Sequence, residues 1–322
     1  MVSVLLPNYN HALYLQQRIE CILNQTYQDF ELIILDDCSS DDSKSIIEQY
    51  RNDPHITHIV YNKENSGSTF KQWNKGVKLA KGEYIWIAES DDIADINFLQ
   101  TLVPKIHQNS TNIVYCQSNR LSSDNIVTGT WLDFTDDLDP VLFQKDFLFN
   151  GHEFIKRFLI YKNVIPNASA VIFRKSVFNS VGGADESVEK CSDWLLWLKL
   201  MTLGDIYFCS KALNHFRYHP DSVIAKITSE KSIFDIFKYD HIMRTKFDIF
   251  LQNCSYSEDI QLFIIQNKQE ITKWKLRVCS IWYHYENKNV SKIKKRILYL
   301  YHLKRYGVLA TFLRQRYSNF KL

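Results

Sequence analysis

Residues 84–92 read Tyr-Ile-Trp-Ile-Ala-Glu-Ser-Asp-Asp, a short apolar run followed by an acidic cluster. An uninterrupted apolar run of this length is typical of a strand buried on both faces of a parallel sheet. Asp91 and Asp92 would then stand at the carboxyl end of that strand, where open α/β sheets bind their ligands. Hard divalent cations bind carboxylates together with substrate phosphates, so the pair predicts a metal site for a phosphate-bearing ligand.

The acid pair also has a simpler interpretation. Asp-Asp pairs are common in turns, and Asp is a preferred N-cap for a helix such as the one predicted from Ile96 to His107. Features elsewhere in the sequence are needed to distinguish a turn from a metal site.

Apolar runs of similar length alternate with helical patterns through the first third of the chain. The predicted strands are 2–6, 30–35, 56–61, 84–88 and 113–117, and the predicted helices between the first four are 13–23, 43–50 and 70–81. Repeated β-α-β units form parallel sheets that are covered by helices on both faces. We therefore expect an α/β fold of the Rossmann-like kind with a mainly parallel sheet.

This alternation weakens after Ser118. Residues 131–149 mix acids with aromatics without a clear period, and we interpret them as a substrate-facing insertion. Regularity then returns at residues 154–161, and the predicted elements that follow are strands at 168–173, 206–209 and 213–218 and a helix at 193–203. From Ser229 the pattern is helical to the end. We expect an α/β domain over residues 1–225 and a helical appendage over residues 226–322.

Composition narrows the class of protein. The chain has 322 residues, 45% of them hydrophobic, which suits a soluble globular protein with a sizeable core. Residues 1–7 do not resemble a signal peptide, and no segment reaches the roughly 18 to 20 apolar residues that span a bilayer. The seven cysteines show no C-x-x-C spacing, which argues against disulfides and structural zinc and favours a reducing cytoplasm.

The net charge of +3 is distributed unevenly along the chain. Residues 271–322 contain 13 Lys/Arg and one acid, Glu286, whereas the first 270 residues contain 26 basic and 35 acidic residues. The tail also carries ten Trp, Tyr and Phe residues, a composition typical of helices that lie on an anionic membrane surface. A helical bundle that packs its aromatics on the first domain is the alternative. We expect no nucleic-acid partner, because no recognised motif accompanies the charge.

Two more strand ends carry polar residues. The first strand leads into Pro7-Asn8-Tyr9-Asn10, and the second leads into Asp36-Asp37-Cys38-Ser39. Because neighbouring parallel strands end at the same edge, these loops can share a pocket in which an Asp accepts a hydrogen bond from the ring N–H of a base. Tyr9 could form an apolar wall of that pocket. Helix capping by residues 39–42 and strand termination at Pro7 are the alternative roles.

A third carboxylate, Asp193, stands at the start of the apolar run Asp193-Trp194-Leu195-Leu196-Trp197-Leu198. As an N-cap it would gain from the helix dipole. As a general base it would take a proton from an attacking hydroxyl. One residue can do both, and the sequence leaves both roles open.

Together these segments resemble the family 2 glycosyltransferases of the GT-A fold. The resemblance rests on residues 2–10, 30–39, 80–92, 181–186 and 193–198, which match the family's motifs in order and spacing. It extends over roughly residues 1–220. Each motif is weak by itself, but five in the right order make a specific match.

The resemblance implies transfer of a sugar from a nucleotide-diphosphate donor, commonly a UDP-sugar, to an acceptor hydroxyl with inversion at the anomeric carbon. By position it implies nucleoside binding by Pro7, Asn8, Tyr9 and Asp36, a ribose or diphosphate contact by Asp91, metal binding by Asp92 and general base catalysis by Asp193. His219 falls where many relatives carry a loop that closes over the diphosphate, and a surface histidine is its alternative role. The metal would be Mn²⁺ or Mg²⁺, whose charge stabilises the departing diphosphate.

The resemblance implies partners, and the cysteine pattern and the basic tail indicate a location. We expect a hexosyltransferase-like enzyme of cell-surface polysaccharide or lipopolysaccharide synthesis, with a nucleotide-sugar donor and a glycan or lipid-linked glycan acceptor. It would work in the cytoplasm, and residues 271–322 would hold it peripherally on the inner face of the membrane.

Three positions depart from the family pattern. Ser192 stands where an acid often precedes the base, Ala184 replaces the usual Phe after the paired glycines, and Trp73 replaces the usual Arg before Asn74. Lys71 or Lys75 could supply the missing positive charge. The first two departures bear on the acceptor pocket more than on the chemistry.

Two other functions are the alternatives. A catalytically silent relative that binds a nucleotide sugar as a scaffold need not keep Asp36, Asp92 and Asp193 together. A nucleotidyltransferase built on a similar sheet would be expected to carry a Gly-rich loop after its first strand, and residues 7–10 contain no glycine.

Overall fold

The first four strands form a parallel half-sheet. In this computed structural model they are β1 (Val2–Asn8), β2 (Phe30–Asp36), β3 (Ile56–Tyr61) and β4 (Tyr84–Ile87), which lie in the order β3-β2-β1-β4. All three pairings are parallel. Every residue of β1, β2 and β4 is buried, because these mainly apolar strands face packed side chains on both sides. The four predicted strands are confirmed to within two residues.

The structure describes residues 1–107, 110–165, 167–188, 191–219, 233–255 and 257–267, together with the single residues 271, 300, 304, 309 and 313. For residues 233–238 it describes the backbone only. The expected domain boundary at residue 225 lies outside these ranges.

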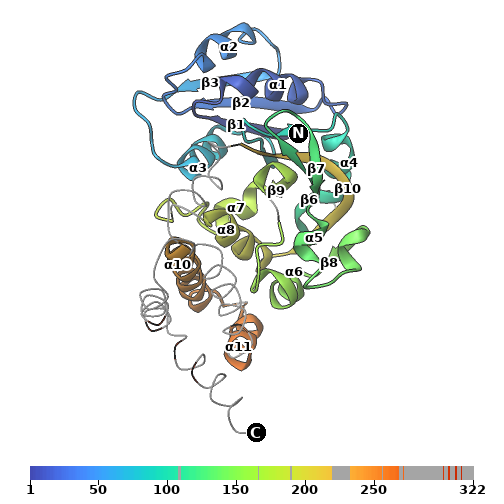
Figure 1. Cartoon of the computed structure of the whole chain (residues 1–322), viewed down its shortest axis with the longest axis vertical. Helices are drawn as coiled ribbons and strands as arrows, with labels where there is room; N and C mark the ends of the chain where they lie inside the picture. The colour runs from blue at the N-terminus through green and yellow to red at the C-terminus, as the bar shows by residue number, and fades with distance from the viewer. Residues whose placement is uncertain are drawn as a thin grey trace, which may run out of the picture.

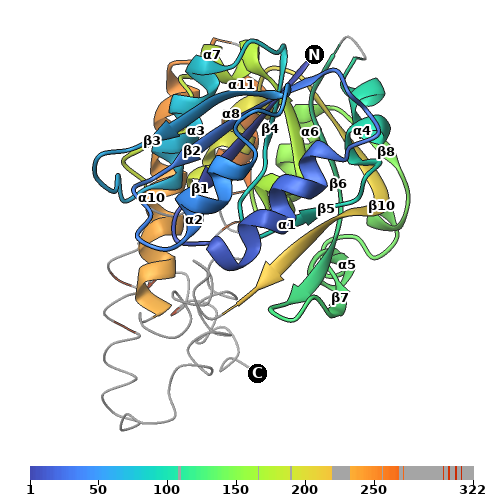
Figure 2. The ribbon, with the colours of Figure 1, turned by 90° about the horizontal axis from the view of Figure 1, so that it is seen from above.

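The predicted helices cover both faces of the parallel half-sheet. The helices are α1 (Ala12–Leu23), α2 (Ser43–Gln49), α3 (Thr69–Leu79) and α4 (Phe98–Ile106). Figures 1 and 2 show α1 and α2 on one side of β1, β2 and β3 and α3 on the other. Strand side chains alternate accordingly: Val4 and Leu6 join the apolar cluster of α1, whereas Leu5 joins that of α3. The expectation of helices on both faces is confirmed.

Beyond β4 the sheet becomes mixed. The full order is β3-β2-β1-β4-β9-β6-β10-β5, where β5 is Ile93–Ala94, β6 Thr111–Ser122, β9 Val171–Arg174 and β10 Asp205–Tyr218. Strand β9 runs antiparallel to both β4 and β6, so β6 regains the direction of β4 and pairs with β10 in parallel. The sequence predicts a strand at 168–173. In the structure the first three of these residues form the 3-10 turn η3 (Ala168–Ala170), and strand β9 begins at Val171. Antiparallel pairs therefore sit among the expected parallel ones.

The two strands predicted at 206–209 and 213–218 form one strand, β10. Its register against β6 shifts between Cys209 and Ala212 and again before Asn214. The polar pair Ser210-Lys211, which interrupts the apolar pattern, lies at this irregularity, and both the N–H and the hydroxyl of Ser210 donate hydrogen bonds to Asp146. A β-bulge, and not a loop, explains the interruption.

The region after Ser118 folds into short pieces that pack on β6 and β10. They are β7 (Val127–Thr130), α5 (Leu132–Thr135), the 3-10 turn η1 (Leu142–Gln144), β8 (Phe147–Phe149), α6 (Gly151–Phe154) and the π-helical turn η2 (Ile155–Leu159). Gly151 allows the close approach of this region to the chain after α8 (Ser192–Met201), since a Cβ there would lie 2.0 Å from the carbonyl oxygen of Gly204. Each of these elements is three to five residues long, which is too short for a helical or strand period to be visible in the sequence.

The described C-terminal helices pack on the same core as the sheet. Helix α10 (Ile233–Gln252) buries Met243, Phe247 and Leu251 in the apolar cluster that also contains Trp197 of α8. Helix α11 (Glu258–Gln266) adds Ile260 to that cluster. Figure 1 shows both helices at the end of the molecule opposite to α1 and α2. The described part of the appendage therefore continues the core of the α/β domain.

Phe247→Ala is expected to lower the free energy of unfolding by about 3–5 kcal/mol, because Phe247 is fully buried between α10 and α8. Ile249→Ala on the same helix is the matched control, since Ile249 is 53% exposed and its loss should change stability by about 0.5 kcal/mol or less. Urea unfolding followed by tryptophan fluorescence measures both. A small effect of Phe247→Ala, or a separate early transition, would show that α10 is an independent unit.

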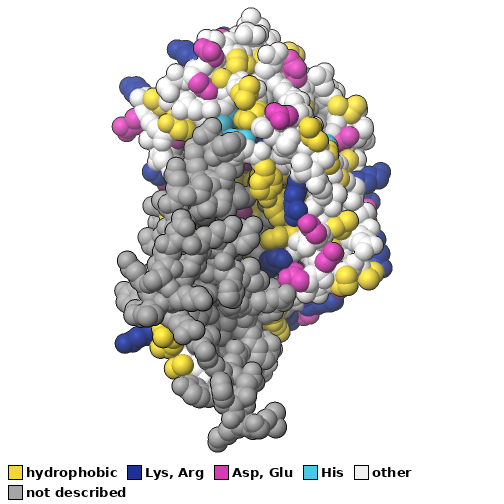
Figure 3. Space-filling model, viewed as in Figure 1, with side chains coloured by type: hydrophobic (Ala, Val, Ile, Leu, Met, Phe, Trp, Pro, Cys, Tyr) yellow, Lys and Arg dark blue, Asp and Glu magenta, His cyan; other side chains and the backbone are white. Residues whose placement is uncertain are grey.

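The basic aromatic tail, residues 271–322, lies outside the described residues except for five single positions. Among the helices that the structure describes, none combines the length and the apolar character needed to cross a membrane. On the described surface seen in Figure 3, Lys and Arg side chains are interspersed with Asp and Glu.

Candidate active site

The loops after β1 and β2 meet as the sequence predicts. Asn8 and Asp36 are register partners at the ends of β1 and β2, and the Asn8 amide donates a 2.8 Å hydrogen bond to Asp36. Asp36 also accepts hydrogen bonds from the backbone N–H and the hydroxyl of Ser39, at 2.9 and 2.6 Å. Its carboxylate therefore closes the loop that leaves β2. Both residues are buried, and Asn8 Oδ1 has no hydrogen-bond partner among the residues described.

The other two predicted nucleoside residues differ in exposure. Pro7 is buried within β1, where its ring is part of the sheet and not of a loop. Tyr9 follows the strand directly and is 47% exposed. A half-exposed ring beside the Asn8–Asp36 pair remains available as the apolar wall that the sequence predicts.

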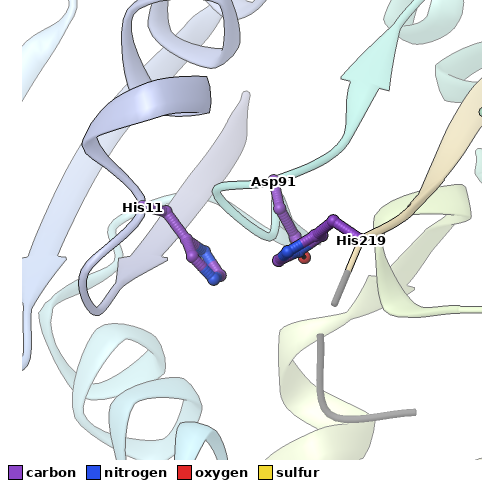
Figure 4. Close-up of side chains that lie close together, drawn as sticks. All are labelled: His11, Asp91 and His219. Atoms are coloured by element: carbon purple, nitrogen blue, oxygen red, sulfur yellow. Dashed lines mark hydrogen bonds and ion pairs between the residues drawn. The ribbon is translucent and has the colours of Figure 1, made fainter. Parts of the chain in front are cut away.

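Asp91 lies in a cluster of possible metal ligands. Its Oδ2 atom is 3.0 Å from Nε2 of His219, which directly follows β10. His11, from the loop before α1, completes the group: each of the three residues offers a ligand atom, and these atoms all lie within 4.8 Å of one another. Figure 4 shows the three side chains directed toward a common point. Sequence reasoning singled out Asp91 and His219 but missed His11, although it follows the Pro7-to-Asn10 segment immediately.

The histidine rings of this cluster are held by packing. The ring of His219 lies 4.9 Å from that of Tyr14 and 5.5 Å from that of His11, measured between centroids. Nδ1 of His11 is 2.8 Å from the hydroxyl oxygen of Ser90. Burial acts to raise the pKa of Asp91, but the His219 hydrogen bond and the nearby charges of both histidines lower it below its usual range. These contacts thus favour the ionised form of the Asp91 carboxyl group.

Asp92 has a different environment from Asp91. Its two carboxylate oxygens accept hydrogen bonds from the Asn167 amide, at 2.9 Å, and from the backbone N–H of Arg217, at 3.0 Å. The residue is 2% exposed. Burial and the charge of Asp91 raise its pKa. This geometry favours Asp91 as a metal ligand over Asp92, to which the resemblance assigns that role, because both oxygens of Asp92 already accept hydrogen bonds, one from Asn167 and one from β10.

Arg217 is a buried residue that sequence reasoning did not identify. It is 1% exposed, and its guanidinium donates hydrogen bonds to the carbonyl of Asp91, the side chain of Asn125 and the side chain of Gln17. These partners come from the β4–β5 loop, the β6–β7 turn and α1. Arg217 and Asp92 together fix the last residues of β10 against the loop that carries Asp91. No sequence signal distinguishes such an arginine from a surface one.

Glu89 occupies the first acidic position of the cluster and is held by Trp73. The indole N–H of Trp73 donates a 2.8 Å hydrogen bond to Glu89, and the hydroxyl of Thr69 lies 3.2 Å from the same carboxylate. Burial, with the charge of Asp91, raises the pKa of Glu89 to about 8. Lys71 and Lys75 do not replace the Arg of the family pattern here, because their ammonium groups contact Ser66 and Asn62.

Asp193 lies in the first turn of α8, where the N-cap residue is Cys191. The N-cap role considered for Asp193 is therefore wrong, although a carboxylate in the first turn still benefits from the helix dipole. The Asn163 amide donates a 3.1 Å hydrogen bond to Asp193, and burial raises the pKa of this carboxyl group. Asn163 and Asn167 belong to one segment, so the same stretch of chain contacts both Asp193 and Asp92.

Two other departures from the family pattern also have defined contacts. The Ser192 hydroxyl donates to the carbonyl of Asp185, and the backbone N–H of Ala184 donates to the Asn74 side chain. Both contacts brace the turn at Gly182-Gly183 against α8 and α3. Neither residue contributes a charged group to the site.

The donor set suits a divalent cation. A carboxylate and an imidazole at 3.0 Å, with a second imidazole beside them, are ligands that Mn²⁺ and related ions accept, and the three come from elements that the fold holds in place. Asp91 also follows the carboxyl end of β4, and open α/β sheets usually bind their substrates and cofactors at this edge. The residues present therefore fit the metal that the family resemblance implies.

Comparisons with known proteins agree with the family resemblance. Residues 3–182 match the profile described as glycosyl transferase family 2. Over 114 residues the chain is 37% identical to the glycosyltransferase GlyG of Streptococcus pneumoniae, a match that covers 35% of this chain and 38% of that protein. It is 25% identical over 292 residues to an uncharacterised glycosyltransferase, RP339, of Rickettsia prowazekii, covering 84% of this chain and 86% of that one.

A solved structure shares the fold. The crystal structure of Staphylococcus aureus TarS residues 1–349 in complex with UDP-GlcNAc superposes with a TM-score of 0.67. The match covers 95% of this chain and 80% of the other, at 18% sequence identity. The mixed sheet and its helices are therefore those of a GT-A fold.

Proposed function

The chain belongs to glycosyl transferase family 2, and from this membership we propose that it transfers a sugar from a UDP-sugar to a hydroxyl of a glycan or lipid-linked glycan, with inversion at the anomeric carbon. UDP is the first nucleotide to consider because the structural neighbour TarS binds UDP-GlcNAc. Relatives named for polysaccharide assembly, such as the teichuronic acid glycosyltransferase TuaG of Bacillus subtilis, support a cell-surface glycan as the acceptor.

One observation carries the proposal. The Asn8–Asp36 pair, the Asp91–His219 pair and Asp193 come from five parts of the chain, and the first two pairs lie at the carboxyl edge of the sheet. The segment that contains Asn163 and Asn167 links Asp193 to the same loop. A nucleoside site, a cation site and a base in this relation are what sugar transfer from a nucleotide donor requires.

The residues divide the reaction among them. Asp193 takes the proton of the acceptor hydroxyl while that oxygen bonds to the anomeric carbon and the bond from this carbon to the diphosphate oxygen breaks. Its burial raises the pKa of the carboxyl group, which makes the carboxylate a stronger base. Asp91 and His219 hold a divalent cation, which when bound neutralises the charge that develops on the departing diphosphate. Asn8, Tyr9 and Asp36 orient the nucleoside.

Calorimetric titration of UDP into the full chain, with and without Mn²⁺, tests the proposal. We expect UDP binding to depend on Mn²⁺, because the diphosphate otherwise faces the ionised Asp91. GDP and dTDP serve as matched nucleotide controls and should bind more weakly than UDP. Absence of binding of all three nucleotides under both conditions would contradict a nucleotide-sugar transferase.

We also propose that residues 271–322 bring the enzyme to an anionic membrane surface. The support is their 13 basic residues, each worth about 1 kcal/mol near such a surface. The full chain should sediment with vesicles that contain anionic lipid and not with neutral vesicles. Neutralising Lys294, Lys295 and Arg296 by Gln should weaken partitioning roughly 100-fold, whereas the same change at Lys44, Lys63 and Lys78 should not. Equal binding to both kinds of vesicle would contradict electrostatic anchoring.

A further inference from the structure

We propose that His11 is a third protein ligand of the cation, so that the site uses two imidazoles and one carboxylate and prefers a first-row transition ion such as Mn²⁺ to Mg²⁺. This inference rests on the proposed function, whose cation ligands are Asp91 and His219. It adds a residue that no motif in the sequence marked, and it gives the site an ion preference.

The first argument is the separation of the ligand atoms. Two ligands that each lie about 2.1 Å from an ion, at right angles to one another, are roughly 3 Å apart. Nε2 of His219 and Oδ2 of Asp91 are 3.0 Å apart, a separation that matches two ligands of one ion. All three ligand atoms lie within 4.8 Å of one another, which leaves His11 within a small side-chain movement of the same ion.

The second argument is the orientation of the His11 ring. Nδ1 of His11 lies 2.8 Å from the Ser90 hydroxyl, and this contact suits a ring that donates its N–H to oxygen and carries its lone pair on Nε2. Metal-ligating histidines commonly use their second nitrogen in this way. Figure 4 shows the ring directed toward Asp91 and His219. Ser90 directly precedes Asp91, so one loop both supplies a ligand and orients another.

The third argument is that His11 has no evident role in capping α1. It occupies the N-cap position of that helix, but its side chain makes no capping hydrogen bond. Asn, Asp, Ser or Thr would serve better there. A histidine at this position is better explained by the cluster that it completes.

The donor set determines the ion preference. Mg²⁺ is bound through oxygen and keeps several of its waters, whereas imidazole nitrogen suits transition ions. Two imidazoles therefore favour Mn²⁺, Co²⁺ or Ni²⁺ over Mg²⁺. The positions that the protein leaves open are the ones through which a diphosphate would bind.

Mn²⁺ binding to the full chain, in the presence of UDP, tests the proposal. The intensity of the free Mn²⁺ signal in electron paramagnetic resonance gives the affinity, and pulsed measurements count the coupled imidazole nitrogens. We expect two imidazoles in the wild-type protein and one in His11→Asn, with Mn²⁺ affinity lowered roughly 10- to 100-fold. Mg²⁺ affinity, measured by competition, should fall less, so the ratio of Mn²⁺ affinity to Mg²⁺ affinity should decrease. The Asn amide can keep the contact with Ser90, which limits any loss of folding.

Two controls make the result specific. His107→Asn, at an exposed position between α4 and β6, should leave both the imidazole count and the affinity unchanged. His219→Ala should leave one imidazole, that of His11. A wild-type protein with a single imidazole, lost in His219→Ala and kept in His11→Asn, would overturn the role of His11 and leave the proposed function standing. Absence of UDP, GDP and dTDP binding, both with and without Mn²⁺, would overturn both.

Discussion

Asp193→Asn is expected to lower kcat for sugar transfer roughly 10²- to 10⁴-fold while leaving UDP and Mn²⁺ binding intact. The substitution removes the group that accepts the proton, but an Asn side chain can still accept the hydrogen bond from Asn163. The structure of α8 should therefore be preserved. The rate is measured as release of UDP from the sugar nucleotide that the wild-type enzyme uses with its best glycan acceptor.

The pH dependence of the wild-type enzyme provides a second readout for Asp193. A general base acts only when deprotonated, and burial raises the pKa of this carboxyl group above its usual range. As the pH is lowered, activity should therefore begin to fall at a higher pH than it would with an aspartate of ordinary pKa. This acidic limb of the pH–rate profile should disappear in Asp193→Asn. Asp205→Asn, at the start of β10, is the matched control and should keep the wild-type profile. If Asp193→Asn retained a tenth of the wild-type rate, another base would have to be sought.

Asp91→Asn is expected to lower Mn²⁺ affinity at least roughly 100-fold. Addition of Mn²⁺ should then no longer increase the affinity for UDP. Asp91 supplies the only carboxylate of the His11–Asp91–His219 cluster among the residues that the structure describes. The transfer rate should fall with the loss of the cation. Calorimetry with UDP and Mn²⁺ measures the effect.

Asp92→Asn is the informative partner of that experiment, because the sequence resemblance assigns metal binding to Asp92. An amide at this buried position places its N–H₂ group against the Asn167 amide donor, or against the backbone N–H of Arg217. We expect a loss of about 1–3 kcal/mol in stability, with Mn²⁺-dependent UDP binding retained. The reverse outcome, with binding lost in Asp92→Asn and kept in Asp91→Asn, would return the metal to Asp92.

Much of the fold is predictable because its signals are local. Apolar runs bounded by polar residues identified β1 to β4 and their helices, and the same runs located the carboxyl ends at which Asn8, Asp36 and Asp91 stand. Such apolar runs can be recognised without knowledge of distant contacts. The antiparallel placement of β9 was missed, since strand direction depends on how a distant segment returns to the sheet. The bulge in β10 was missed for a related reason, because Asp146 stabilises it from another element.

The sequence by itself determined the α/β class, the strand ends that carry the acids, and the family to which the motifs point. Only the tertiary structure showed the different surroundings of Asp91 and Asp92, because adjacent residues with the same side chain differ in the remote groups that reach them: His219 contacts one, whereas Asn167 and the backbone of Arg217 contact the other. It also brought His11 to the cluster and placed Cys191, not Asp193, at the start of α8. Local patterns determine which elements form, whereas the chemistry of a side chain depends on neighbours that are remote in the chain.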